Sequence, residues 1–146
     1  MNKEDHYQYL IRLFHSAPIN QQVFDSSELK LSDGKAEYSL TVQEEYYHGA
    51  EAMHGAVYFK MLDDAAYFAV STQVDDAFLV TKSFSLDFLR PVVAGKLTAK
   101  GQLISEEEGV FHAQSEILNE QGKLVGRGNG VFVRSSKKLQ ELPIED

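Results

Sequence analysis

The feature that most restricts the fold is one long apolar segment, from Gly55 to about Thr72. Its apolar residues recur at intervals of three and four, and neither proline nor an internal glycine interrupts them. We therefore expect a single helix of about five turns. The helix is apolar around more than half of its circumference, which is more than a flat surface can cover. This pattern predicts a curved sheet wrapped around one central helix.

Strand patterns flank this helix in the sequence. Before it, residues 28–42 alternate apolar and polar side chains on both sides of Asp33-Gly34, which is typical of a tight hairpin. After it come four strand-like runs separated by turn residues, near positions 77–90, 96–106, 109–119 and 123–134. We expect these four runs to form an antiparallel meander, in which each strand pairs with the next.

The two ends of the chain differ from this core. Apolar residues at helical spacing predict a short amphipathic helix over residues 3–16, which would lie beside the core as a lid or flank. Residues 135–146 are charged and lose periodicity, which indicates a mobile tail. The sequence thus predicts one α+β domain over residues 1–146, with its core at about 28–134.

Composition excludes several classes of function. The chain has no cysteine, so it has no disulfides, no thiolate nucleophile and no thiolate metal site. Its net charge of −8 disfavours binding to nucleic acid or to an anionic membrane. No apolar run approaches the roughly 20 residues of a membrane span, and the N-terminal pattern is not that of a signal peptide. We expect a cytoplasmic protein that needs no metal.

Two adjacent aspartates interrupt the apolar helix. Asp64 follows Lys60 by one turn on a narrow polar stripe, so we expect it to be the more solvated or ion-paired of the two. Asp63 lies at the border of the apolar face. A carboxylate at that border must either reach a polar partner or be partly desolvated with a raised pKa, and desolvated acids are common functional groups.

The start of the helix supplies a second candidate site. His54 and Gly55 stand where the first turn leaves backbone N–H groups without intrahelical acceptors, and glycine lets a ligand approach closely. The Gly55 N–H could stabilise the oxyanion formed when a carbonyl group is attacked. Asp63 lies about 13 Å further along the helix, too far to act on the same carbonyl. We therefore expect a two-fold homodimer with antiparallel helices, in which each site combines Gly55 of one chain with Asp63 of the other.

These residues resemble a known family, the hotdog-fold acyl-CoA thioesterases of the phenylacetate-pathway (PaaI-type) branch. His54-Gly55 opens the long helix, Asp63 follows nine positions after the histidine, and an Arg90-Pro91 turn comes after the next strand. The order of elements also fits from about residue 28 to 134. The resemblance implies a hotdog fold, which is a highly curved antiparallel sheet around the helix, and the hydrolysis of an acyl-CoA thioester.

The resemblance also implies residue roles. In similar enzymes the helical carboxylate is the nucleophile or the general base on water, which gives that role to Asp63. Gly55 becomes the oxyanion donor, and His54 orients the thioester or the helix start. Thr81 on the next strand matches a hydroxyl residue that positions the water, with Ser83, one inward position along, as the alternative. No cofactor is implied; the partners are an acyl-CoA substrate and further copies of the chain, as a homodimer or a dimer of dimers.

Two positions depart from the family pattern. Many relatives carry asparagine six residues before the histidine, where this chain has His48, and Ala56 replaces a common second glycine. Histidine can donate a hydrogen bond as asparagine does, but it also changes charge near neutral pH. The candidate substrate-binding residues are Asp64, Ser83, Tyr67, Arg90 and Arg134, with the arginines as contacts to the phosphates of coenzyme A. Two alternatives stay open: a non-catalytic protein that binds or senses acyl-CoA, and a hydratase or dehydratase of hydroxyacyl thioesters.

Overall fold

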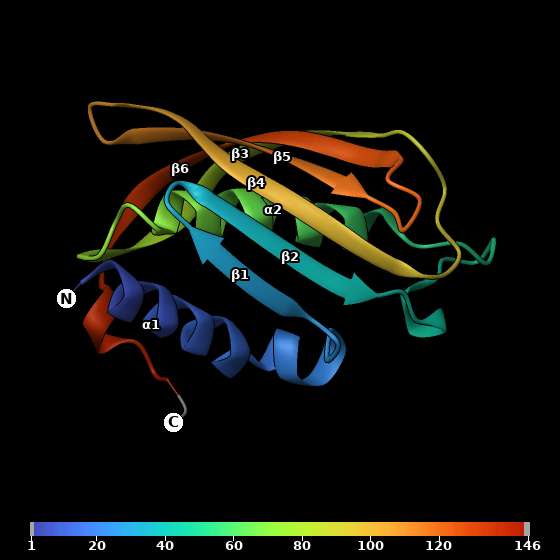
Figure 1. The fold of residues 1–146 in the computed structure, drawn as a ribbon, viewed down its shortest axis with the longest axis horizontal. Coiled ribbons are helices and arrows are strands. Elements are labelled where there is room, and N and C mark those ends of the chain that lie inside the picture. Colours follow the sequence, from blue (N-terminus) through green and yellow to red (C-terminus); the bar gives the residue numbers. More distant parts are fainter. Residues whose placement is uncertain (1, 145–146) are drawn as a thin grey trace.

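The computed structural model describes residues 2–144, which form a six-stranded antiparallel sheet curved around one central helix, with a second helix packed alongside (Figure 1). In chain order the elements are α1 (Lys3–Ser16), η1 (Ile19–Val23), β1 (Glu28–Ser32), β2 (Lys35–Thr41), η2 (Glu44–Tyr46), α2 (Gly55–Ser71), β3 (Ala77–Phe88), β4 (Lys96–Glu107), β5 (Val110–Leu118), β6 (Leu124–Lys138) and η3 (Leu139–Glu141). Across the sheet the strand order is β1-β2-β4-β5-β6-β3. The expected α+β arrangement, a curved sheet around one long helix with a short N-terminal helix, is confirmed.

The central helix α2 contacts all six strands. It lies so close to β4 that a Cβ on Gly101 would be 2.0 Å from the carbonyl oxygen of Ala65, so only glycine fits there. On β5, the Ser115 hydroxyl donates to the carbonyl oxygen of Leu62 at 2.8 Å. These close contacts explain why the helix is apolar on most sides.

Neither α2 nor any other helix in residues 2–144 is long and apolar enough to cross a membrane.

The position of β3 differs from the expected meander. Strands β4, β5 and β6 do follow one another, because tight turns at Gly109 and Gly122, with φ of 82° and 77°, join them. β3, however, pairs with β6 at the far edge of the sheet. The longer connection over residues 89–95 carries the chain from that edge back to β4. Turn signals in the sequence separate strands, but only short turns also dictate which strands pair.

The first elements agree closely with the sequence pattern. β1 and β2 form an antiparallel hairpin around Asp33 and Gly34, and Gly34 has the positive φ of 70° that this tight turn requires. α1 spans the expected residues and buries Leu10 and Phe14. η1 follows directly, so the first part of the chain forms a cover along one side of the core (Figure 1).

The mobile tail expected from residue 135 is wrong for residues 135–142. β6 continues to Lys138, where it still pairs with Ala77 of β3. Leu139 is then only 3% exposed, and its carbonyl oxygen accepts a hydrogen bond from the Tyr9 hydroxyl of α1. η3 therefore lies beside α1 (Figure 1). The tail looked aperiodic because the last residues of β6 extend beyond the pairing with β5, which ends at Val133, and residues 136–138 are all exposed. Positions 145–146 lie outside the described residues.

Candidate active site

Asp63 lies near the middle of α2 and faces β3. The Thr81 hydroxyl donates to its Oδ1 at 2.9 Å, while Oδ2 accepts no hydrogen bond within residues 2–144. Burial raises the pKa of Asp63 to about 6 against the lowering effect of the Thr81 hydrogen bond, and the charge of Asp64 adds to the rise while that of Lys60 opposes it. Asp63 thus combines both expected features, because it has a polar partner in Thr81 and burial shifts its pKa upward. At neutral pH the group is mainly an anion with one oxygen available for chemistry.

A bulge in β3 decides which hydroxyl reaches Asp63. Leu79 and Thr81 point toward α2, but the pairing with β6 shifts between Thr81 and Ser83, so that Lys82 is the extra residue. After this shift Phe84 points inward and Ser83 points outward, where it is exposed. The expectation that Ser83 lies one inward position along from Thr81 is therefore wrong, because strict alternation fails at a bulge.

Lys60 and Asp64 form the expected ion pair, but on a covered face of α2. Their side chains are only 11% and 21% exposed. The Lys60 ammonium also donates to Asn20 Oδ1 at 2.7 Å and to the Tyr38 hydroxyl at 3.1 Å. It lies 4.7 Å from the centre of the Tyr38 ring and 5.1 Å from that of Phe24. α1 and η1 cover the polar stripe, so Asp64 is ion-paired and not solvated.

A cavity of about 520 Å³ lies between α1 and η1 on one side and α2 and β3 on the other. Asp63, Asp64, Tyr67 and Thr81 line one part of it, so four of the predicted site residues meet there. The Tyr67 hydroxyl donates to the carbonyl oxygen of Leu79 at 2.8 Å, and burial raises its pKa. Tyr67 is thus a neutral wall of the cavity and not a proton source.

The start of α2 opens into a second, separate cleft. His54 caps the helix, because its Nδ1 accepts from the Ala56 N–H at 2.9 Å. The Gly55 N–H donates to no acceptor within residues 2–144. The cleft has a volume of about 370 Å³, and its lining includes Gly55 and Phe88. A free N–H at a helix start, facing a cleft, is suited to hold a developing negative charge.

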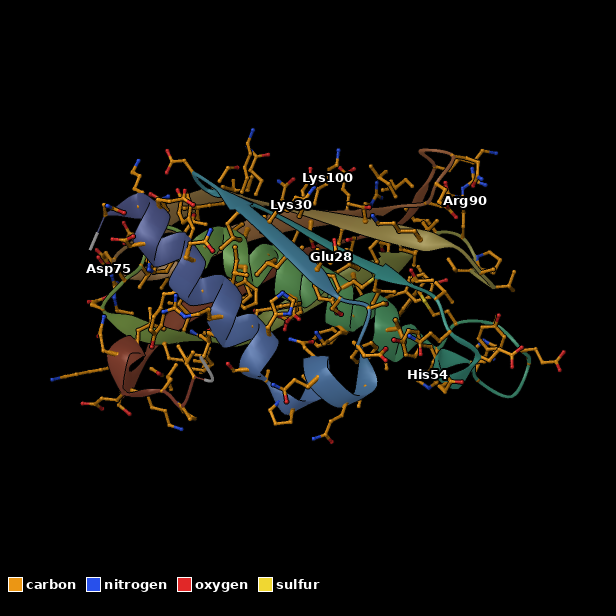
Figure 2. The ribbon with its side chains drawn as sticks, turned by 60° about the horizontal axis from the view of Figure 1, so that its bottom comes forward. Glu28, Lys30, His54, Asp75, Arg90 and Lys100 are labelled. Carbon is orange, nitrogen blue, oxygen red and sulfur yellow. The ribbon has the colours of Figure 1, made fainter. Side chains whose placement is uncertain are left out.

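Two further predicted residues join this second cleft. His48 lines it, with its ring centre 6.5 Å from that of His54, and its Nδ1 accepts from the Ala50 N–H at 3.0 Å. Arg90 lines it as well. Figure 2 shows His54 and Arg90 toward one end of the molecule and Asp75, which follows the other end of α2, at the opposite end.

Arg134 belongs to neither cavity. It is exposed, forms an ion pair with Asp76 at 3.1 Å and lies over the ring of Phe111 at 5.6 Å. A role in binding coenzyme A would require it to leave these contacts or to meet the ligand outside the two cavities. Within one chain, therefore, the predicted site residues other than Ser83 and Arg134 fall into two groups, one around Asp63 and one around Gly55.

Sequence reasoning missed the contribution of the chain ends to the Asp63 cavity. Leu13, Asn20, Leu142 and Pro143 all line it. Asn20 also holds the segment in place, because its Nδ2 donates to the Phe14 carbonyl oxygen at 2.9 Å and its Oδ1 accepts from Lys60. No motif marks these residues; only the amphipathic pattern of α1 pointed to a segment that covers the core.

The chain matches known proteins in sequence. The family model of the thioesterase superfamily matches residues 51–126. The acyl-coenzyme A thioesterase PaaI of Escherichia coli is 31% identical over 103 residues, which cover 70% of this chain and 72% of that protein. A protein of Saccharolobus solfataricus described as an esterase is 23% identical over 137 residues, or 94% of this chain and 98% of that protein.

Solved structures match the fold over most of the chain. The PaaI protein of E. coli, from the phenylacetic acid degradation operon, superposes with a TM-score of 0.82 at 24% identity and covers 93% of this chain and 97% of that one. A variant of PaaI from Thermus thermophilus superposes with a TM-score of 0.72 at 22% identity, covering 82% of this chain and 100% of that one. The helix with Gly55 and Asp63 lies inside the matched family segment. The chain therefore belongs to the thioesterase superfamily and is a PaaI-type protein with the hotdog fold.

Proposed function

We propose that this protein hydrolyses acyl-CoA thioesters in a site shared between two subunits. Membership of the thioesterase superfamily makes the chain a thioester hydrolase, and the acyl-CoA substrate is suggested by the E. coli relative named for that activity. One observation carries the site assignment. Asp63 has a carboxylate oxygen without a protein partner, facing a cavity, while the free N–H of Gly55 faces another.

The chemistry needs a base or nucleophile and an oxyanion donor. With Asp63 as general base, it takes a proton from a water whose oxygen attacks the thioester carbon, while Thr81 holds the carboxylate in place. The carbonyl oxygen becomes an oxyanion and accepts from the Gly55 N–H. When this tetrahedral intermediate collapses, the carbon–sulfur bond breaks, and the leaving thiolate of coenzyme A takes up the proton that Asp63 removed from the water. With Asp63 as nucleophile, its free oxygen instead forms an anhydride that water then cleaves.

The two groups must come from different chains, and contacts within one chain suggest how. Asp63 of α2 touches Thr81 of β3. Eight positions earlier on the helix, Gly55 lies against Phe88 of the same strand, whose ring would be 3.1 Å from a Cβ on Gly55. α2 and β3 thus run antiparallel over this stretch. The paired segments 55–63 of α2 and 81–88 of β3 therefore have Asp63 and Thr81 at one end and Gly55 and Phe88 at the other. If a two-fold axis passes through the middle of these segments, Asp63 and Thr81 of one chain lie next to Gly55 and Phe88 of the other chain.

The position of that axis follows from the midpoints. Phe59 stands halfway between Gly55 and Asp63, and Phe84 and Ser85 stand halfway between Thr81 and Phe88. Phe59 and Phe84 pack edge to face with ring centres 5.5 Å apart, and Phe59 is 41% exposed. Beside them, the outer edge of β3 pairs with no strand of residues 2–144. An unpaired edge next to exposed aromatic rings favours association of two copies through β3 and α2.

A cysteine crosslink tests this axis. The chain has no cysteine, so Ser85→Cys introduces a single thiol close to the proposed axis, and two copies should form a disulfide-linked dimer under mild oxidation. Ser136→Cys, also exposed and on β6, is the matched control and should stay unlinked. Equal crosslinking of both variants, or none in either, would contradict the proposed axis.

A mixing experiment tests the shared site itself. Asp63→Asn removes the carboxylate, and Gly55→Pro removes the N–H at a helix position that tolerates proline. His54 already has the extended backbone, with ψ of 144°, that a residue before proline prefers. Each variant alone should release no coenzyme A. After subunit exchange, mixed dimers hold one intact site, so a 1:1 mixture should regain about a quarter of the wild-type activity.

One control variant and two contrary outcomes complete the mixing experiment. Gly55→Ala keeps the N–H and should remain active, which separates the loss of a donor from crowding against Phe88. If the 1:1 mixture stays inactive although subunits exchange, the site lies within one chain and the proposal is wrong. If the wild type binds acyl-CoA but never releases the thiol, the protein is a non-catalytic acyl-CoA binder.

A further inference from the structure

The cavity beside Asp63 has one apolar side and one polar side. The apolar side comes from α1, η1, β3 and the segment after η3, and includes Leu13, Ile19, Phe78 and Leu142. The polar side comes from α2 together with Thr81 of β3, and it carries Asp63. A thioester carbonyl held at Asp63 would therefore direct its acyl group away from α2, into the apolar side.

Three side chains on the polar side, Lys60, Tyr67 and Thr81, could donate hydrogen bonds to a ligand, but each already donates to a group of the protein. The Thr81 hydroxyl is used on Asp63, and the Tyr67 hydroxyl is used on the carbonyl oxygen of Leu79. The Lys60 ammonium donates to Asn20, Tyr38 and Asp64, which uses all three of its protons. A carboxylate at the far end of an acyl group would find none of these donors free.

The charge of the cavity leads to the same result. Among residues 2–144, the lining includes two carboxylates, Asp63 and Asp64, against one ammonium group, that of Lys60, so acidic groups outnumber basic ones. A further carboxylate brought in by the substrate would be repelled and would also lose its water. An apolar chain meets neither penalty and gains from burial against Leu13 and Ile19.

We infer, resting on the proposed acyl-CoA hydrolysis, that this cavity holds the acyl group and that the enzyme selects uncharged, apolar acyl groups over acyl groups that end in a carboxylate. Leu13, Ala17, Ile19 and Leu142 line the cavity but lie outside residues 51–126, the segment shared with the family model. The choice of acyl group therefore depends on the chain ends, while the reaction depends on the shared segment.

Paired substrates test the inference on the wild-type protein. Hexanoyl-CoA and adipyl-CoA have the same number of carbons and differ in the terminal carboxylate. We expect kcat/KM to be at least about tenfold higher for hexanoyl-CoA, because the terminal carboxylate of adipyl-CoA would lose its water in a cavity that already holds the carboxylates of Asp63 and Asp64. From butyryl-CoA to octanoyl-CoA, kcat/KM should rise by up to about fourfold for each buried methylene. Equal values for hexanoyl-CoA and adipyl-CoA would overturn the inference.

Variants locate the selection in this cavity. Leu13→Trp fills the space beside Asp63 and should lower the octanoyl-to-butyryl ratio of kcat/KM by about tenfold or more, since about two methylenes lose their burial. Val23→Trp adds the same side chain to η1 at a position 51% exposed and outside the cavity lining, and should leave the ratio unchanged. If circular dichroism shows that Leu13→Trp misfolds, Ala17→Leu fills the cavity from the next turn of the chain.

The outcomes separate this inference from the proposed function. An unchanged chain-length ratio in a folded Leu13→Trp or Ala17→Leu variant shows that the acyl group binds elsewhere, while coenzyme A release by the wild type upholds the proposed hydrolysis. No release from any acyl-CoA by the wild type would instead refute the proposed function.

Discussion

Replacing Asp63 with asparagine should make the protein more stable at neutral pH while it abolishes hydrolysis. In the folded chain the pKa of Asp63 is about 6, against 3.8 for an ordinary aspartate, and burial is the main cause. Folding therefore favours the protonated form, and ionisation of Asp63 opposes folding. One pKa unit corresponds to about 1.4 kcal/mol, so the penalty reaches about 3 kcal/mol once the pH exceeds 6.

The difference in unfolding free energy between Asp63→Asn and the wild type should increase with pH. Below about pH 3 the carboxyl group is protonated in both the folded and the unfolded chain, so Asp63 and asparagine should be nearly equivalent. Between about pH 3 and 6 the unfolded chain ionises first, and the wild type loses stability relative to Asp63→Asn. The variant should thus be more stable by about 2–3 kcal/mol at pH 8 and by almost nothing at about pH 3.

Urea unfolding at several pH values measures this difference, at one fixed protein concentration because the stability of the proposed dimer would depend on it. Asp64→Asn is the matched control, since it removes the neighbouring charge. It should destabilise the protein by about 2–4 kcal/mol, because the Lys60 ammonium, 11% exposed, loses its carboxylate. If Asp63→Asn destabilises the protein, or if its effect is the same at about pH 3 and at pH 8, burial does not control the ionisation of Asp63.

Three further predictions concern the site and the core. The kcat/KM of the wild type should rise with pH, with a midpoint at about 6, the pKa of Asp63. Asp64→Asn should lower this midpoint, because the charge of Asp64 raises the pKa of Asp63. A flat pH profile would exclude Asp63 as the ionising group. His54→Ala should lower the free energy of unfolding by about 1 kcal/mol and reduce kcat, while His54→Asn, which can also cap the helix, should restore stability. Gly101→Ala should destabilise the fold by about 3 kcal/mol or more in thermal unfolding, because its Cβ would be 2.0 Å from the Ala65 carbonyl oxygen; a smaller loss would mean that α2 can move away from β4.

Local patterns in the sequence predicted most of the fold. The bounds of α1, the β1–β2 hairpin and α2 agree with the expected ranges because each depends on contacts between residues close in the chain. The place of β3 was not predictable in this way. Its partner β6 begins at Leu124, and no feature within residues 77–90 distinguishes pairing with β6 from pairing with β4. Long-range pairing depends on the whole sheet.

The candidate site was predictable where a motif marked it. Helical spacing predicted Gly55 at the start of α2 and Asp63 at the border of its apolar face, and the resemblance to the family pointed to Thr81, whose hydroxyl donates to Asp63. Ser83 failed because a bulge reverses the alternation after Thr81. The covering of Lys60 and Asp64 was missed because η1 has no signature in the sequence, so a polar stripe on α2 looked solvent-exposed.

The edge position of β3 has a consequence for how this protein is made. On the ribosome, Ala77–Phe88 is synthesised well before Leu124–Lys138, its one sheet partner within residues 2–144. Until that last strand emerges, the twelve-residue segment of β3 has no partner strand on either edge, and its apolar side chains, such as Leu79 and Phe84, stay exposed. Translation that stalls before residue 124 would leave an aggregation-prone nascent chain. Yield in cells should therefore depend on the speed of synthesis between these two strands and on chaperones that shield β3, even when the finished protein is stable.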